Sequence, residues 1–173
     1  FGNDYASGNY TIPTFCAKST DGGDTWALTG TIGYTTANRV AVAEPGISIQ
    51  SGVLHCICRT VETNYYHYTS NDYGVTWTKQ ADLSFGSFIM TKPDLCNYGN
   101  DNFIAIQLSG KVGELALPET KRSTLGIYRT SDWVTFTLIK ETRTETYIHY
   151  PMMFVYGSDI YLSYTKGIPA KGT

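Results

Sequence analysis

The sequence predicts an all-β protein in which one unit of about fifty residues recurs along the chain. Three observations lead to this prediction: a composition that favours strands, a turn motif that returns at a regular interval, and a second motif that returns in phase with it. The 173 residues include 24 threonines and 14 tyrosines, and only 16% are charged. Long helices and disordered segments need more charged residues, whereas Thr and Tyr favour strands.

Charge and hydropathy exclude several classes of protein. Thirteen basic and 15 acidic residues give a net charge of −2, which is too balanced for a protein that binds nucleic acid or a membrane surface. No apolar run approaches the ~18 residues of a membrane helix, and the first residues do not resemble a signal peptide. We therefore expect no nucleic-acid partner and no membrane span.

The cysteines are too few and too scattered for a disulfide framework: Cys16, Cys56, Cys58 and Cys96. Cys56 and Cys58 are two apart in an expected strand, so both thiols should lie on one sheet face and pack as small apolar groups. His55 faces the other way, and His67 and His149 are isolated in the sequence. We expect no metal and no cofactor, because ligand clusters are missing.

The turn motif reads S-x-D-x-G-x-T-W. It occurs as Ser19–Trp26 and again, 51 residues later, as Ser70–Trp77; Thr130–Phe136 (TSDWVTF) is a shorter copy without the glycine. Ser and Asp side chains bond to the amides of such a turn, Gly supplies an unusual backbone angle, and the Trp is expected to be buried. This turn chemistry explains the aspartates of the motif without a catalytic role: Asp21, Asp72 and Asp132.

The second motif is X-Pro followed by an apolar strand. It occurs as Glu44-Pro45, Lys92-Pro93 and Tyr150-Pro151, at intervals of 48 and 58 residues. Each copy follows the aromatic end of a turn motif by 14 to 18 residues. The two motifs therefore mark one recurring unit.

Each complete unit contains four short strands, which with an aromatic at a fixed place describe a blade of a β-propeller. The expected strands are Pro45–Gln50, Val53–Thr60, Tyr65–Ser70 and Thr76–Gln80 in one unit, and Pro93–Asn97, Phe103–Leu108, Leu125–Thr130 and Phe136–Lys140 in the next. The chain starts with the last strands of a blade and ends with the first strands of another: Tyr10–Lys18 and Thr25–Thr31, then Pro151–Tyr156 and Ile160–Thr165.

The chain thus covers two full blades and two partial ones of a single propeller domain, divided as 1–43, 44–91, 92–149 and 150–173. Propellers close with 4–8 blades, so we expect a segment of a longer protein; pairing of such segments in a homo-oligomer is the alternative. The long insertion between residues 108 and 123 is expected to be a loop at the rim.

Hairpin register places two candidate residues. With Ser51-Gly52 as a two-residue turn, an unslipped register puts Glu44 opposite Arg59 at the open end of the hairpin. An ordinary salt bridge that closes a hairpin would look the same. The X-Pro repeat makes Lys92 and Tyr150 equivalent to Glu44, so these side chains should gather at the axial opening. For Lys92, a solvent-exposed surface charge is the more common alternative.

These motifs resemble those of the sialidase (neuraminidase) superfamily. The turn motif resembles the Asp-box, or bacterial neuraminidase repeat, and AEPGISIQSGVLHCICRT resembles the sialidase segment that carries a glutamate and an arginine. That segment is also similar to bacteriophage endosialidases. The resemblance covers essentially the whole chain and implies adjacent blades of a six-bladed sialidase-type propeller.

The resemblance also implies roles for three residues. Arg59 matches one of three arginines that grip a sialic-acid carboxylate through two-pronged bonds. Glu44 matches the glutamate that takes a proton from a tyrosine, and Tyr150 matches that tyrosine, which attacks the anomeric carbon. A free phenol, with a pKa near ~10, needs such a carboxylate partner at neutral pH.

The chain departs from the family pattern at one position and lacks others. Lys111 replaces, within a residue, the arginine expected in the following blade, and it keeps the charge but loses the planar fork. The family's acid/base aspartate and another arginine belong to blades that are not present. The remaining arginines have no matching context: Arg39, Arg122, Arg129 and Arg143.

The sequence therefore predicts a sialidase-like glycoside hydrolase that acts on sialic-acid-type or other acidic surface glycans. Glu44 and Tyr150 are the candidate catalytic residues, and Arg59, Lys92 and Lys111 are the candidate substrate-binding residues. The alternatives are a non-catalytic glycan- or receptor-binding propeller, as in an adhesin or a phage tail protein, and a scaffold without a small ligand. Free cysteines, many Tyr and Thr residues and few charges suit a virion or cell-surface protein that is made in a reducing cytosol, and we expect an extracellular, cell-surface or virion location.

Overall fold

A computed structural model describes residues 13–34, 42–60, 64–85, 91–108, 123–144 and 147–167. These residues form strands and no α-helix, which confirms the all-β prediction. The strands are β1 (Pro13–Lys18), β2 (Ala27–Tyr34), β3 (Ala43–Gln50), β4 (Val53–Arg59), β5 (Tyr66–Ser70), β6 (Thr78–Lys79), β7 (Asp94–Tyr98), β8 (Asp101–Leu108), β9 (Thr124–Thr130), β10 (Thr137–Arg143), β11 (Ile148–Tyr156) and β12 (Asp159–Lys166).

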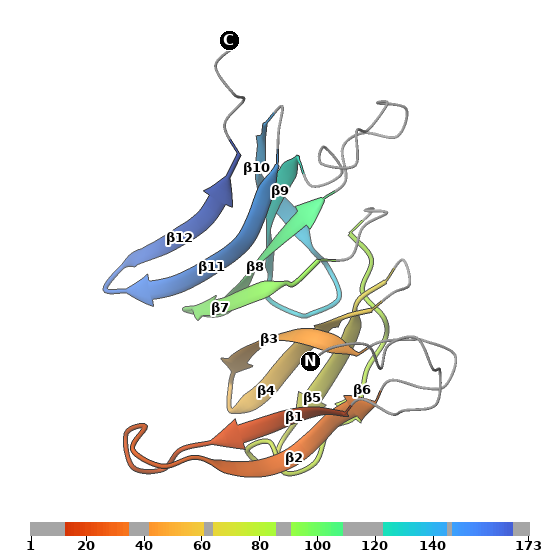
Figure 1. The fold of residues 1–173 in the computed structure, drawn as a ribbon, viewed down its shortest axis with the longest axis vertical. Helices are drawn as coiled ribbons and strands as arrows, with labels where there is room; N and C mark the ends of the chain where they lie inside the picture. Colours follow the sequence, from red (N-terminus) through yellow and green to blue (C-terminus); the bar gives the residue numbers. More distant parts are fainter. Residues whose placement is uncertain are drawn as a thin grey trace.

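The strands form four antiparallel sheets whose order follows the sequence. Two sheets have four strands, β3-β4-β5-β6 and β7-β8-β9-β10, and they are flanked by the two-stranded sheets β1-β2 and β11-β12. Two complete units between two half units is the organisation that the two repeats predict. The first strand of each later sheet, β3, β7 and β11, lies beside its counterpart in the neighbouring sheet, and the three strands point the same way (Figure 1).

Three apolar clusters hold neighbouring sheets together. One between the second and third sheets includes Ile57, Leu95 and Ile104, each less than one-tenth exposed. Another joins the first and second sheets through residues such as Ile32 and Cys56, and the last joins the third sheet to β11 and β12. The core is therefore a series of sheet-to-sheet contacts, as expected where each unit buries its faces against its neighbours.

The cysteines behave as the sequence predicts. All four are free thiols among the described residues. Cys56 and Cys58 are fully buried, and their sulfur atoms lie 3.7 Å apart on one face of β4. The contact with the neighbouring Cys58 thiol and burial raise the pKa of Cys56.

The repeat turns, meaning the copies Ser19–Trp26, Ser70–Trp77 and Thr130–Phe136, connect the third and fourth strand of each unit. In the middle copy the Ser70 hydroxyl accepts the Gly74 amide at 2.9 Å, and the Asp72 carboxylate accepts the Thr76 amide at 2.8 Å. Corresponding bonds to the Ser and Asp side chains occur in the first copy, and bonds to Thr and Asp in the third. The aspartates are thus committed to turn hydrogen bonds.

One expectation about the repeat turns is wrong. Trp26 was expected to be buried, but its side chain is 67% exposed, whereas its counterpart Trp77 packs against the cluster between the first two sheets. The physical reason is position. Trp77 belongs to a sheet with a neighbour on that face, and Trp26 belongs to the first described sheet.

Candidate site at the open end of the inner hairpins

Arg59 and Glu44 form an ion pair at the end of the β3–β4 hairpin. The Nη1 atom of Arg59 lies 2.8 Å from Oε2 of Glu44, and their side chains are 34% and 42% exposed. The predicted turn and register hold from Gln50 back to Gly46. Beyond Gly46 a bulge shifts the pairing by one residue, so Arg59 stands opposite Ala43 and not opposite Glu44. The direct pairing was therefore wrong by one residue.

The bulge explains how the two side chains still meet. Glu44 has a φ of 47°, in the left-handed region that non-glycine residues rarely adopt. This conformation is also unfavourable for a residue before proline. The extra residue in the bulged strand changes the direction of the Glu44 side chain, and the carboxylate reaches the guanidinium of Arg59.

The same bulge recurs in the last hairpin. There His149 pairs with Thr165, the register shifts before Met152, and Tyr150 has a φ of 53°. The pair His149–Thr165 lies 106 residues after Ala43–Arg59, so Tyr150 occupies the position of Glu44. Glu44 lies near the start of β3 and Tyr150 near the start of β11, and β3, β7 and β11 start at the same end of their sheets in Figure 1. The Tyr150 side chain is 68% exposed.

In the X-Pro repeat, Lys92 is the residue of the third sheet that corresponds to Glu44 and Tyr150. Its Nζ atom is 3.8 Å from Oδ1 of Asp94, and its side chain is 38% exposed, so it is a partly exposed cation with an acidic neighbour. Burial raises the pKa of Asp94, while Lys92 and a hydrogen bond from a backbone amide oppose the shift. The fifth candidate residue, Lys111, lies outside the described residues.

The third sheet has no arginine at the position equivalent to Arg59. In that sheet the Thr91 hydroxyl and the Gln107 backbone bond to each other, at 3.3 and 3.4 Å, and both residues lie 48 positions after Ala43 and Arg59. The equivalent of Arg59 is therefore Gln107, a buried neutral amide that is 2% exposed. The repeat arithmetic of the sequence could have identified it.

Tyr65 is a buried residue behind the ion pair that sequence reasoning did not select. It is fully buried, and its hydroxyl accepts the backbone amide of Thr91 at 3.2 Å, which connects the second sheet to the third. Burial raises its pKa, and the hydrogen bond from Thr91 and the charge of Arg59 act in the opposite direction. Tyr65 is therefore a protonated, structural phenol at neutral pH.

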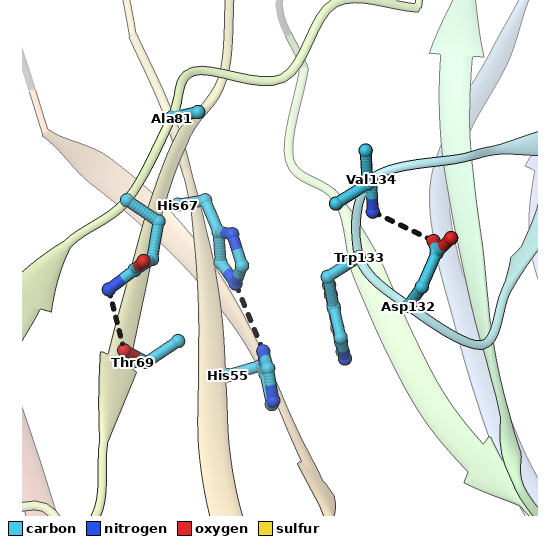
Figure 2. A pocket seen from close by; sticks show the side chains of 8 residues that line it. His55, His67, Thr69, Ala81, Asp132, Trp133 and Val134 are labelled. Carbon is cyan, nitrogen blue, oxygen red and sulfur yellow. Dashed lines mark hydrogen bonds between the residues drawn. The ribbon is translucent and has the colours of Figure 1, made fainter.

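A concave region lies at the junction of the second and third sheets. It is a cleft of about 240 Å³ lined by His55, His67, Thr69, Gln80, Ala81, Asp132, Trp133 and Val134. His55 Nδ1 and His67 Nε2 are 3.0 Å apart, and Trp133 from the next sheet stacks on His55 with ring centres 4.1 Å apart (Figure 2). The sequence alone did not bring these two histidines together, because they are diagonal neighbours whose contact depends on how β4 pairs with β5.

The described residues show no metal centre. No group of three or more His, Cys, Asp or Glu side chains in this part of the chain is arranged to hold an ion. Nδ1 of His55 and Nε2 of His67 share one hydrogen bond, in which one nitrogen donates and the other accepts. No helix within the described ranges has the length and apolar character to cross a membrane.

Comparisons with known proteins identify structural neighbours but no sequence relatives. No protein-family model matches the sequence, and no curated protein matches it. Among solved structures, the sialidase of Trypanosoma rangeli superimposes with a TM-score of 0.69 at 15% identity over 89% of this chain. A mutant of it with trans-sialidase activity gives the same values. The same sialidase in complex with sialic acid gives a TM-score of 0.65 at 15% identity.

The chain spans about a quarter of the length of these neighbours. At this level of identity the superposition shows the fold. The chain is a segment with the fold of a sialidase-type β-propeller.

Proposed function

We propose that the chain contributes the Glu44, Arg59 and Tyr150 side chains to the site of a sialidase-like glycoside hydrolase. The substrate class is a sialic-acid-type or other acidic glycan. The observation that carries the proposal is the Arg59–Glu44 ion pair at 2.8 Å, together with the equivalent bulge that presents Tyr150. The fold neighbours support it, since structures of the Trypanosoma rangeli sialidase hold sialic acid and 2,3-difluorosialic acid.

The proposal gives each side chain a chemical role. Arg59 uses Nη1 for Glu44, and a guanidinium carries further N–H donors for a ligand carboxylate. Glu44 acts as the base that removes the phenol proton of Tyr150. The phenolate oxygen then attacks the anomeric carbon, the glycosidic bond breaks and the alcohol of the substrate leaves, which gives a glycosyl–tyrosine intermediate. Lys92 and Lys111 add positive charge for an acidic ligand. An acid/base group is not assigned within this segment.

The test is a substitution that removes only the nucleophilic oxygen. In the full-length protein, Tyr150→Phe should abolish cleavage of a sialoside while leaving its dissociation constant within about threefold of wild type. Tyr156→Phe is a matched control, because Tyr156 lies on the same strand and is 74% exposed. Unchanged turnover in Tyr150→Phe would remove this residue from the mechanism.

A second candidate function is glycan binding without turnover, as in an adhesin or a phage tail receptor-binding protein. Gln107 favours it, because a neutral buried amide occupies the position of Arg59 in the next sheet and offers no second guanidinium there. Arg59→Ala should weaken retention on an array of acidic glycans. Retention equal to wild type would instead indicate a scaffold propeller. Both glycan functions place the protein outside the cell, on a cell surface or on a virion.

A further inference from the structure

Tyr150 is held in an unfavourable backbone conformation. It lies with Pro151 in the bulge between His149 and Met152, and its φ of 53° is rare for a bulky residue. Such a conformation persists when the surrounding structure determines it. The question is which groups determine it.

Two side chains of the third sheet bind the strand on either side of the bulge. The Nε2 atom of Gln107, on β8, donates to the backbone carbonyl of Ile148 and lies 3.4 Å from Nδ1 of His149. The carboxylate of Asp94, on β7, accepts the backbone amide of Met153 at 2.5 Å. The bulge is therefore attached to the third sheet before and after Tyr150.

Both attachments are shielded from water. Gln107 is 2% exposed and the Asp94 side chain is 16% exposed. A hydrogen bond in such a place is not easily replaced by one to water, so its loss would leave a backbone group of β11 without a partner. The β11 backbone beside Tyr150 is consequently fixed relative to the third sheet.

The equivalent positions of the second sheet do not provide this arrangement. Arg59, the counterpart of Gln107, bonds to Glu44 within its own hairpin, and no bond from it to the third sheet occurs among the residues that the structure describes. The counterpart of Asp94, which lies 48 residues earlier, is Gly46, and a Cβ atom there would lie 2.3 Å from Leu95. The pair Gln107–Asp94 is thus specific to the sheet that faces the Tyr150 bulge.

We propose that Gln107 and Asp94 are positioning residues that fix the direction in which Tyr150 leaves β11. They touch the backbone around Tyr150 and not the ligand, so their effect on chemistry is through the placement of the phenol. This inference rests on the proposed role of Tyr150 in catalysis. It also predicts a structural effect that can be measured without a substrate.

The kinetic test uses one pair of matched glutamines. Gln107→Met keeps the side-chain length and removes the donor, and we expect it to lower kcat at least tenfold with KM within about threefold of wild type. Gln50→Met is the control, since Gln50 also joins the second and third sheets, through the carbonyls of Asn100 and Ser131, away from the bulge. A fall in kcat that is equal in both variants would show general loosening and overturn the proposal.

The substrate-free test measures amide hydrogen exchange in the folded protein over residues 148–153. Gln107→Met and Asp94→Leu should each accelerate exchange there at least tenfold, whereas Gln50→Met should not. Asp94→Asn keeps an acceptor oxygen and should exchange like wild type. Unchanged exchange in the first two variants overturns the proposal.

The two tests separate this inference from the proposed function. If the wild-type protein cleaves no glycan but exchange responds as expected, the hydrolase function fails and the attachment of the bulge stands. If it cleaves a sialoside and Gln107→Met retains wild-type kcat, the function stands and the positioning role fails.

Discussion

Arg59 and Glu44 form an ion pair although they are not register partners in their hairpin. Arg59 stands opposite Ala43, and the bulge at Glu44 brings the carboxylate within 2.8 Å of the guanidinium. A bulge with positive φ is an unfavourable way to close a hairpin, and bulges often redirect a side chain next to a functional site. Ligand binding and stability are two explanations of this arrangement, and they predict different energies.

A double-mutant cycle distinguishes them. Because both side chains are more than one-third exposed, the coupling free energy of Arg59→Ala and Glu44→Ala should be below about 1 kcal/mol in urea unfolding. Arg59→Lys should nevertheless weaken binding of an acidic glycan about tenfold or more, since the two-pronged bond is lost.

Arg129→Lys is the control for that binding experiment, because the ion pair of Arg129 with Asp101 is long, 3.9 Å, and its side chain is 52% exposed. A coupling energy of about 3 kcal/mol without a change in glycan affinity would show that the Arg59–Glu44 pair stabilises the hairpin and does not bind the ligand.

The fold was predictable because its signals are local and repeated. The turn motif fixes where the third strand of each unit ends, and the Ser51-Gly52 turn fixes the register of the β3–β4 hairpin. The bulge at Glu44 was not predicted, since a register count assumes that no residue is inserted. The contact between His55 and His67 and the packing of Trp133 on it depend on how strands and sheets pair, which spacing along one strand does not contain.

Trp133 and Trp26, which lie in the third and first repeat turns, should differ in their contribution to stability. Trp133 is 7% exposed, stacks on His55 and donates from Nε1 to Gln50 at 2.6 Å. Trp133→Ala should lower the free energy of unfolding by about 3–5 kcal/mol. Trp26→Ala, at a side chain that is 67% exposed, should change it by less than about 1 kcal/mol. Equal losses in urea unfolding would contradict the packing at the sheet junction.

Gly74 should tolerate a side chain less well than Gly157. Both have positive φ, 90° and 60°, so an alanine is strained at either position. At Gly74 a Cβ atom would also lie 2.8 Å from Cys16 Sγ, whereas at Gly157 nothing lies within 4 Å. Gly74→Ala should therefore cost about 1–3 kcal/mol more than Gly157→Ala in urea unfolding. If both substitutions cost the same, the first sheet, which carries Cys16, must shift away from the new methyl group without a loss of stability.

Acid should weaken the protein in two separate pH windows. Burial lowers the pKa of His55 and of His67 from 6.5 to about 4. The unfolded chain therefore binds protons at a higher pH than the folded one. The stability from the neutral pair is present above pH 6.5 and is lost as the pH falls toward 4. The hydrogen bonds from Thr76 and Ser70 lower the pKa of Asp72 from 3.8 to about 2, so its contribution is lost only between those values.

The measurement is the free energy of unfolding in urea at closely spaced pH values. Between pH 7 and 5 we expect a loss on the order of 4 kcal/mol from the histidine pair, about 2 kcal/mol from each ring. His67→Gln leaves one titrating ring in the cleft, so its loss over the same interval should be about half as large. Asp72→Asn should keep the full loss between pH 7 and 5, lower stability by a constant amount over that interval, and remove the further loss below about pH 4, because the carboxylate titrates there. A wild-type stability that does not change from pH 7 to 5 would mean that the cleft opens enough for both rings to titrate as they do in water.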